Sequence, residues 1–300
     1  MTLSWGTRTH VMGVINLTPD SFSDGGRFNR PERALAQARQ LVAAGVEILD
    51  LGAQSTRPGA ADVGAAEEIG RLLPALQLIR SAIAAGQLRC PRSGLPPLLS
   101  VDTYRAAVAE AGLEHGADWI NDVSGGSRDP DLLPLVAQAG CPYVLMHSRG
   151  DSQSMDGLVD YGSAGVVAGV LSELQRASER ALAAGLRREQ LIWDPGLGFA
   201  KTTEQNLELL RGLPQLRAEA VPLLVGPSRK RFIGAVLKEP RAKARLWGTA
   251  AVVAQCVSVG VDVVRVHDGK PIVQVVQMAD ALWRDPAGAD AAAAEAYSGA

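Results

Sequence analysis

Short apolar runs alternate with longer amphipathic segments along most of the chain. Eight of these runs have the length and composition of buried strands: Val11–Ile15, Ile48–Leu51, Leu98–Val101, Trp119–Ile120, Tyr143–Met146, Leu191–Trp193, Leu223–Val225 and Val263–Val266. The segments that follow them have apolar residues at helical spacing: Glu32–Ala44, Ala65–Ala84, Ala106–His115, Asp131–Ala139, Gly165–Ala184, Glu204–Leu210, Ala242–Val259 and Pro271–Trp283. Eight strands, each followed by a helix, predict an α/β fold with parallel strands, the (β/α)8 or TIM barrel.

An open, doubly wound sheet is the alternative architecture. That fold usually carries a G-x-G-x-x-G turn after its first strand. Here a long polar loop follows the first predicted strand, and the nearest glycine pattern, Gly196-Leu197-Gly198, follows the sixth. The barrel is therefore favoured.

Length and composition fit one large domain. The chain has 300 residues, of which 47% are hydrophobic, and it contains no stretch with the composition of a linker. We predict a barrel domain over residues 1–284 and a disordered, alanine-rich tail over residues 285–300. The turn-rich segment Gly86–Pro97 is expected to be an exposed loop.

Charge and cysteine content exclude several classes of protein. The formal net charge of −2 gives no basic surface for nucleic acid. The chain begins without a signal-peptide pattern and has no apolar run long enough to cross a membrane. Cys90, Cys141 and Cys256 have neither metal-site nor disulfide-framework spacing. We expect free thiols and a cytoplasmic protein.

Polar residues follow every predicted strand. In a parallel barrel, the carboxyl ends of the strands form the active face. The side chains expected there are Asn16, Asp50, Asp102, Asn121, Asp122, His147, Asp194, Ser228, Lys230, Arg265 and His267. Carboxylates and amides that meet cations at one mouth need each other or a ligand. The set therefore predicts a binding site for a polar ligand.

This predicted site has two chemical halves. Asp102, Asn121 and Asp194 offer acceptors and an amide to a flat heterocycle with an N–H edge. Asn16, Arg57, Arg265 and His267 offer donors and positive charge to phosphate oxygens. A heterocycle that carries phosphate would satisfy both halves. We interpret Asp50 as a brace for loops and leave it out of the site, we expect His10 and His115 to be structural, and the role of His147 stays open.

Longer strings resemble the signatures of the dihydropteroate synthases. The segment from Met12 to Gly26 (MGVINLTPDSFSDGG) resembles the first signature, and Ser55–Gly59 (STRPG) the second. Shorter matches follow in the family's order: Val101–Thr103, Ile120–Asp122, Met146-His147, Asp194–Phe199, Gly226–Lys230 and Arg265–Asp268. The resemblance implies a homodimeric, Mg2+-dependent transferase of folate biosynthesis. Its reaction would join 6-hydroxymethyl-7,8-dihydropterin pyrophosphate to p-aminobenzoate, giving 7,8-dihydropteroate and pyrophosphate.

The resemblance also implies roles for individual residues. The pterin would contact Asp102, Asn121, Met146, Asp194, Gly226 and Lys230. The pyrophosphate would contact Asn16, Arg57, Arg265 and His267, with Asn16 also near the Mg2+. The p-aminobenzoate would contact Phe22, Thr56, Pro58, Phe199 and Ser228. Catalysis would depend on Asp24, Arg57 and Lys230.

One departure from the family pattern keeps two alternatives open. Gly52-Ala53-Gln54 stands where many members have Gly-Gly-Glu, and the missing carboxylate is compatible with an inactive paralogue. A methyltetrahydrofolate-binding barrel would share the pterin residues Asp102, Asn121 and Asp194. Such a module has no need of the Thr18–Gly26 and Ser55–Gly59 loops, which are intact. The synthase is therefore the preferred interpretation.

Overall fold

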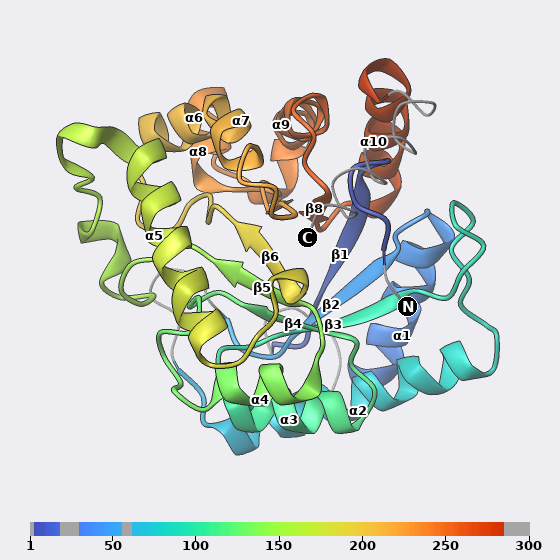
Figure 1. Ribbon diagram of the computed structural model, residues 1–300. Helices are drawn as coiled ribbons and strands as arrows, with labels where there is room; N and C mark the ends of the chain where they lie inside the picture. The colour runs from blue at the N-terminus through green and yellow to red at the C-terminus, as the bar shows by residue number, and fades with distance from the viewer. Residues whose placement is uncertain (1–2, 19–29, 56–61, 285–300) are drawn as a thin grey trace.

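The computed structural model describes residues 3–18, 30–55 and 62–284 (Figure 1). Five predicted site residues lie outside these ranges: Phe22, Asp24, Thr56, Arg57 and Pro58. The predicted tail, residues 285–300, also lies outside them. The boundaries of the predicted domain and the disorder of the tail therefore stay predictions.

Eight parallel strands form one sheet, in the order β6-β5-β4-β3-β2-β1-β8-β7. Their bounds are β1 His10–Asn16, β2 Ile48–Gly52, β3 Leu98–Asp102, β4 Trp119–Asp122, β5 Tyr143–Met146, β6 Leu191–Asp194, β7 Leu224–Val225 and β8 Val263–Val266. The sheet closes where Trp193 of β6 forms a bridge with Leu223, just before β7. The backbone N–H of Trp193 also donates to the carbonyl oxygen of Pro222 at 2.8 Å. The predicted (β/α)8 barrel is confirmed.

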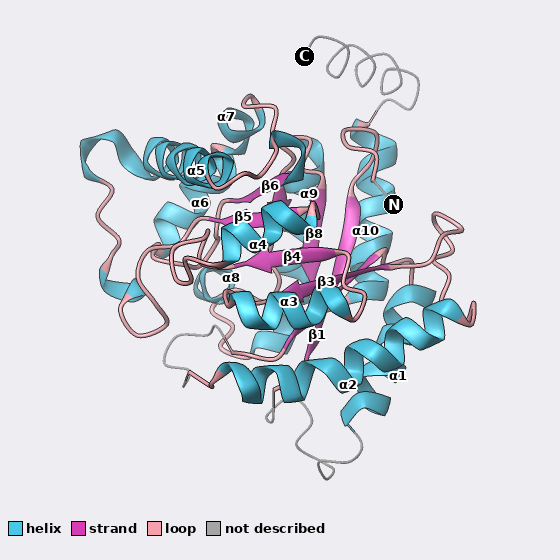
Figure 2. Cartoon of the chain, turned by 60° about the horizontal axis from the view of Figure 1, so that its bottom comes forward, coloured by secondary structure: helices cyan, strands magenta, loops and turns pink. Residues whose placement is uncertain are grey.

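Helices surround the strands on the outside of the barrel (Figures 1 and 2). The α-helices are α1 Arg30–Ala43, α2 Ala65–Ala84, α3 Ala106–Glu114, α4 Leu132–Ala139, α5 Gly165–Ala183, α6 Thr203–Arg211, α7 Leu213–Arg217, α8 Arg231–Leu237, α9 Leu246–Ser258 and α10 Gly269–Trp283. Short 3-10 helices are η3 Met155–Gly157, η4 Gly162–Ala164, η5 Arg188–Gln190 and η6 Ala242–Arg245. The predicted helix Ala242–Val259 is therefore two elements, η6 and α9.

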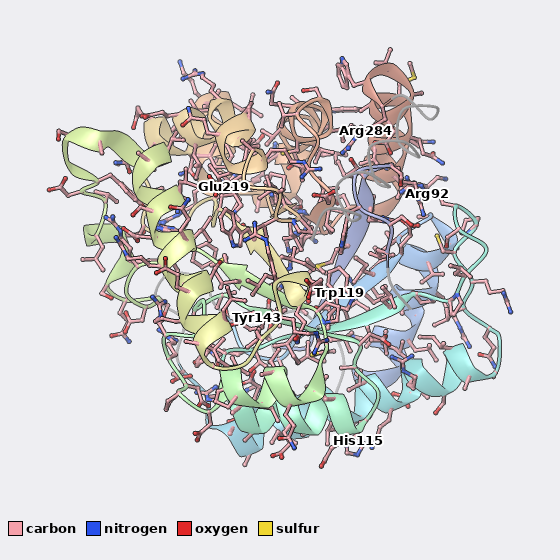
Figure 3. The ribbon with its side chains drawn as sticks, viewed as in Figure 1. Arg92, His115, Trp119, Tyr143, Glu219 and Arg284 are labelled. Carbon is pink, nitrogen blue, oxygen red and sulfur yellow. The ribbon has the colours of Figure 1, made fainter. Side chains whose placement is uncertain are left out.

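Local chemistry explains several helix ends. Thr202 begins α6 with a capping box: its hydroxyl accepts from the Gln205 N–H at 3.2 Å, and the Gln205 side chain accepts from the Thr202 N–H at 2.9 Å. At the end of α4, Gly140 adopts a φ of 67°, a left-handed conformation that glycine tolerates best. His115 follows α3, and its Nδ1 lies 2.8 Å from the Ala111 carbonyl oxygen, as expected for a structural histidine (Figure 3).

The strands are buried on both faces, as a barrel requires. Their outward side chains pack against the helices, and their inward side chains form a separate cluster. This inner cluster consists of Met12, Ile48, Leu98, Trp119, Val144, Ile192, Leu224 and Val263. Trp5, which precedes β1, packs against this inner cluster, and its ring centroid lies 6.1 Å from that of Trp119. Figure 3 labels Trp119 among the strands.

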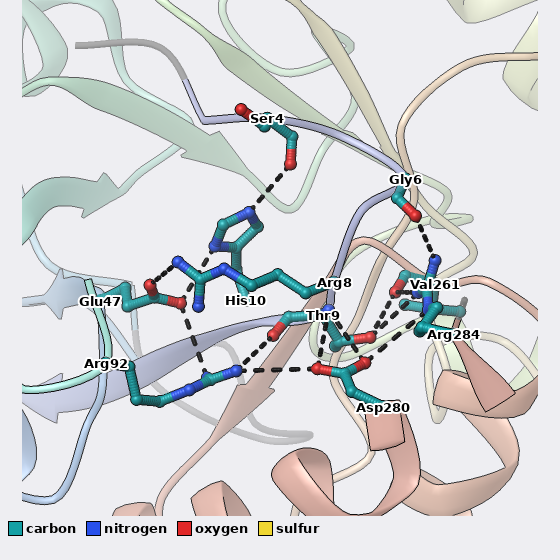
Figure 4. A network of polar contacts seen from close by, with 10 residues as sticks. All are labelled: Ser4, Gly6, Arg8, Thr9, His10, Glu47, Arg92, Val261, Asp280 and Arg284. Atoms are coloured by element: carbon teal, nitrogen blue, oxygen red, sulfur yellow. Dashed lines mark hydrogen bonds and ion pairs between the residues drawn. The ribbon is translucent and has the colours of Figure 1, made fainter. Parts of the chain in front are cut away.

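A polar network covers the N-terminal face of the barrel (Figure 4). His10 contacts Glu47 at 3.0 Å, which confirms its structural role, and Arg8 also binds this carboxylate. Arg92 reaches both Glu47 and Asp280, at 3.6 and 3.7 Å. The Gly86–Pro97 loop is exposed at half of its residues, as predicted, but Arg92 and the buried Cys90, which is 1% exposed, anchor it to the protein.

Two features concern the environment of the protein. All three cysteines lie in the described part of the chain and are free thiols. Among the described residues, no helix combines the length and apolarity that a membrane crossing requires.

Candidate active site

In-register strand ends bring the predicted ligand residues onto neighbouring positions. Asp102 ends β3 and pairs with Asn121 of β4, while Met146 ends β5 and pairs with Asp194 of β6. All four side chains are buried, with at most 8% of their surface exposed. The C-terminal face thus holds two carboxylates and an amide in a setting that contains little water.

Arg265 of β8 crosses the mouth of the barrel and contacts two carboxylates. Its Nε donates to Asp50 Oδ2 at 2.6 Å, and its Nη2 donates to Asp102 Oδ2 at 2.6 Å. The Asn121 side chain also donates to Asp50, at 3.2 Å. Asp50, left out of the site in the sequence analysis, is fully buried and fixes two predicted ligand residues.

These contacts set the electrostatics of the pterin half. Burial raises the pKa of Asp102 to about 7, and the Arg265 guanidinium opposes that rise. Burial alone would lower the pKa of Arg265, but Asp50 and Asp102 outweigh burial and hold it above its ordinary value. Arg265 is therefore a permanent cation whose orientation is set by two carboxylates.

Asp194 combines a structural contact with an unused acceptor. Its Oδ1 accepts the Gly196 backbone N–H at 2.8 Å, which shapes the turn after β6. Its Oδ2 makes no hydrogen bond to the described residues. A side chain at Gly226 would meet this Oδ2 at 3.9 Å, so the absence of one leaves space beside the carboxylate. Burial raises the pKa of Asp194, while the Gly196 N–H and the cations of Lys230 and Arg265 lower it.

Lys230 and Phe199 lie against each other. The Lys230 Nζ stands 4.3 Å from the centre of the Phe199 ring, within the range of a cation–π contact. Burial lowers the pKa of Lys230 to about 8, and Asp194 opposes this effect. The structure therefore places a predicted pterin residue beside a predicted p-aminobenzoate residue.

Ser228 and His267 also meet. The Ser228 hydroxyl lies 3.0 Å from His267 Nδ1 and 3.1 Å from the His267 backbone nitrogen. Burial lowers the pKa of His267 to about 3, and the positive charge of Arg265 contributes further. His267 is thus neutral near pH 7 and offers a phosphate group a hydrogen bond rather than a charge.

A cavity of about 430 Å³ joins several of these residues, but Asn121, Met146 and Asp194 are not among the residues that line it. The predicted site residues that line it are Asn16, Asp102, Phe199, Gly226, Ser228, Lys230, Arg265 and His267. A neighbouring cavity of about 590 Å³ lies over the ends of β3, β4 and β5 and shares Gln54, Ser55, Met155 and Phe199 with the first. Met155, from η3, is a lining residue that no motif marks.

Several predicted mouth residues have bracing roles instead. Asp122 accepts hydrogen bonds from Tyr143 and from the backbone of Ser124 and Gly126, at 2.6 to 2.7 Å. His147 is 4% exposed and lies beneath the loop that follows β6. Gln54 bridges the ends of the second loop: it donates to the Ser55 carbonyl at 2.9 Å and accepts from the Val63 N–H at 3.0 Å.

The residues present fit a magnesium ion only with help from a ligand. Among the described residues, no three His, Cys, Asp or Glu side chains cluster as a metal site. Asn16 offers one amide oxygen on the wall of the cavity, near Arg265 and His267. Mg2+ commonly binds through one or two protein oxygens, several waters and substrate phosphates. The donor set therefore suits a Mg2+ that arrives with a pyrophosphate group.

The fold and the site define a (β/α)8-barrel protein whose mouth offers carboxylates, an amide and cations to a polar ligand. A model of the family described as pterin binding enzymes matches residues 12–267. The chain belongs to this family.

Several relatives of this chain are named dihydropteroate synthases. It is 47% identical over 281 residues to a dihydropteroate synthase of Synechocystis, an alignment that covers 93% of this chain and 92% of the relative. It is similar to the crystal structure of a Clostridium difficile dihydropteroate synthase in the presence of pteroic acid, with a TM-score of 0.85, 35% identity, and coverage of 95% of this chain and 100% of that one. The Xanthomonas albilineans enzyme in complex with 7,8-dihydropteroate gives a TM-score of 0.79, 33% identity, and coverage of 94% and 96%.

Proposed function

We propose that this protein acts as a dihydropteroate synthase, a transferase of folate biosynthesis. It joins 6-hydroxymethyl-7,8-dihydropterin pyrophosphate to p-aminobenzoate and releases 7,8-dihydropteroate and pyrophosphate. The observation that carries the proposal is the unused Oδ2 of Asp194, a buried side chain at the end of β6 near the charges of Lys230 and Arg265. Relatives that match over nearly the whole chain, among them those of Synechocystis and Xanthomonas albilineans, have this activity in their names.

The pterin half of the site recognises an N–H edge. We assign Asp194 Oδ2 to the amino and ring N–H groups of the pterin, because a charged acceptor gives such a pair both energy and orientation. Asp102 and Asn121 contact the remaining ring nitrogens, and Met146 packs on the ring. Gly226 leaves room for the ring edge, and Lys230 supplies a positive charge on its carbonyl side.

The pyrophosphate lies toward β1 and β8. Arg265 contributes a permanent charge and His267 a hydrogen bond, and Asn16 would offer its amide oxygen to a Mg2+ that arrives with the pyrophosphate. When bound, Mg2+ supplies charge neutralisation to the leaving group. We assign Arg57 of the second loop to the same group; it lies outside the described residues.

The p-aminobenzoate lies against Phe199 and Ser228, with Phe22, Thr56 and Pro58 of the loops completing this part of the site. Its amine is already unprotonated near neutral pH, so it attacks the pterin methylene carbon without a strong base. The carbon–oxygen bond to pyrophosphate breaks, and the new amine loses one proton. Positioning and exclusion of water therefore account for most of the catalysis. We assign Asp24 to stabilising positive charge on the pterin as the bond breaks.

The deciding experiment measures pyrophosphate release and dihydropteroate formation by the purified protein with Mg2+. Release should require both substrates together. Release that does not depend on p-aminobenzoate, or no release at all, would reject the proposal.

Asp194→Asn provides a test of the site itself. The variant keeps the acceptor for the Gly196 N–H but loses the charge that pairs with the pterin. Removal of one partner of a buried, charged pair costs about 2–5 kcal/mol, so pterin affinity should fall roughly 30-fold or more. Calorimetric titration with the pterin substrate measures this loss, and circular dichroism checks the fold. Unchanged affinity would show that Asp194 does not bind the pterin.

We also propose that the protein is a cytoplasmic homodimer. The exposed apolar side chains of the late helices support a dimer: Trp247 on α9 is 78% exposed, and Val236 and Leu237 on α8 are 55% and 49% exposed. The free state of all three cysteines supports a reducing compartment. Cell fractionation tests the location, and the mass in solution tests the dimer.

A further inference from the structure

The loop that connects β6 to α6, residues 194–202, carries residues of both substrate sites. Asp194 begins it, and Phe199 lies further along it. Its backbone is unusual, because Gly196, Gly198 and Ala200 all have positive φ, of 67°, 79° and 49°. A Cβ at Gly196 would collide with the carbonyl oxygen of His147, so this loop rests directly on the residue that follows β5. Such a backbone needs contacts that hold it in place.

Lys201 supplies these contacts from inside the loop. Its side chain is buried, and its Nζ lies 3.0 Å from the Gly196 carbonyl oxygen and 2.9 Å from that of Phe199. A third contact, at 3.0 Å, goes to Nδ1 of His147. Among the described residues, no carboxylate lies close enough to form an ion pair with Nζ. A buried ammonium with backbone and imidazole partners alone is costly, so a plain packing role does not explain it.

The partners of His147 define which of its nitrogens accepts. Its Nε2 lies 2.9 Å from the Glu173 carboxylate, which can only accept, so Nε2 carries the proton. Nδ1 is then free to accept from Lys201. Arg149 also donates to Glu173, with its Nε at 3.2 Å. Lys201, His147, Glu173 and Arg149 thus form a continuous chain of polar contacts.

We propose that Lys201 is a positioning residue that holds the 194–202 loop and thereby fixes the Asp194 carboxylate and the Phe199 ring relative to each other. It touches neither substrate; it acts through the carbonyls of Gly196 and Phe199. The inference rests on the proposed function, because these two side chains belong to the two substrate sites. His147 is the acceptor that completes the set of three hydrogen bonds.

The protonation of Lys201 gives this clamp a pH dependence. Burial lowers its pKa to about 7; Asp194 and Glu173 oppose that change, and Lys230 and Arg149 add to it. Burial and the Lys201 charge lower the pKa of His147 to about 4, so His147 is a neutral acceptor near pH 7. An ammonium donates three hydrogen bonds but a neutral amine only two. The clamp is therefore complete below pH 7 and loses one bond as the pH rises through that value.

The test compares Lys201→Met with Lys243→Met, a matched change at an exposed lysine. We expect Lys201→Met to lower kcat/KM for p-aminobenzoate at least tenfold and to reduce the wild-type change in this value near pH 7, leaving the part that comes from Asp102, whose pKa is also about 7. Lys243→Met should behave as the wild type. A folded Lys201→Met with wild-type KM values and an unchanged pH profile would overturn the proposal.

A second pair of variants applies if Lys201→Met does not fold. His147→Asn keeps an acceptor close to the position of Nδ1, whereas His147→Leu removes it. We expect His147→Asn to stay within about threefold of wild-type kcat/KM and His147→Leu to lose at least tenfold. Equal effects of the two would contradict the clamp. A wild-type protein that forms no dihydropteroate would reject the proposed function instead, and pterin titration of these variants would still test the clamp.

Discussion

Arg265 has a fixed direction because two carboxylates hold it from different strands. Asp50 of β2 and Asp102 of β3 each accept one of its N–H groups at 2.6 Å. The carboxylate of Asp50 is fully buried, and its Oδ1 has no partner among the described residues. Asp50 therefore contributes to the site by fixing Arg265 rather than by reaching the ligand.

Asp50→Ala should destabilise the fold. Removal of one partner leaves the partly buried Arg265 guanidinium with less compensation, and the free energy of unfolding should fall by about 2–4 kcal/mol, somewhat less than for a fully buried pair. Urea denaturation followed by circular dichroism measures the loss. Asp156→Ala is the matched control, because its ion pair with Arg231 is exposed and should contribute less than about 1 kcal/mol. Similar losses in both variants would show that Asp50 does not brace Arg265.

Pterin pyrophosphate should bind less tightly above pH 8. Burial lowers the pKa of Lys230 to about 8 in the free protein, so its cation is present below this pH and is lost as the pH rises through it. Each further pH unit then reduces the affinity up to about tenfold. Calorimetry between pH 7 and 9.5 measures the effect, and Lys230→Arg, which keeps its charge, should flatten it. An affinity that stays constant in the wild type over this range would contradict the role of Lys230.

At the scale of elements, regular hydrophobic periodicity predicts most of the barrel. The strands Tyr143–Met146 and Val263–Val266 and the helix Ala65–Ala84 have the predicted bounds, and the other predicted strands shift by a residue or two. The short helices α7 and α8 were not predicted, because five and seven residues do not show a full amphipathic repeat. The sequence indicates that Asp50 lies at the mouth but not that it holds Arg265, because the two residues are 215 positions apart in the chain. No motif marks Lys201, whose contacts depend on the shape of its loop and on His147.

The proposed dimer should depend on α8 and α9. A side chain added at Gly248 of α9 would meet Ile233 and Leu237 of α8, so these helices form one surface with the exposed Trp247. We expect Trp247→Glu to reduce the mass in solution from that of a dimer to that of a monomer, as measured by light scattering. Trp283→Glu, at the 50% exposed end of α10, should leave the mass unchanged. A monomeric wild type, or a dimer that tolerates Trp247→Glu, would contradict this interface.

At the scale of the whole molecule, the two ends of the barrel have separate tasks. The C-terminal end collects the ligand residues, whereas the N-terminal end collects the network around Glu47, Arg92 and Asp280 (Figure 4). This division is typical of (β/α)8 enzymes. It explains why sequence motifs identify the chemistry well but say little about the N-terminal network, whose residues belong to no motif.

Arg92→Met should therefore affect stability without affecting catalysis. The Arg92 side chain is 9% exposed. It forms ion pairs with Glu47 and Asp280 and donates a hydrogen bond to the Thr9 carbonyl oxygen. The loss of the hydrogen bond to Thr9 and of the two longer ion pairs should cost about 1–2 kcal/mol in the free energy of unfolding. The kcat/KM for p-aminobenzoate should stay at the wild-type value. A change in kcat/KM with stability preserved would contradict the division of tasks.

Closure of the barrel also has a consequence during synthesis. β1 pairs along one edge with β8, so the edge at His10 stays unpaired until Val263 has been synthesised. At a ribosomal rate of about 5–20 residues per second, this interval lasts roughly 13 to 50 seconds. Throughout that time the nascent chain presents an unpaired strand edge, which invites pairing with other chains. Successful production of this protein in a cell thus depends on how the emerging chain is protected until its last strand arrives.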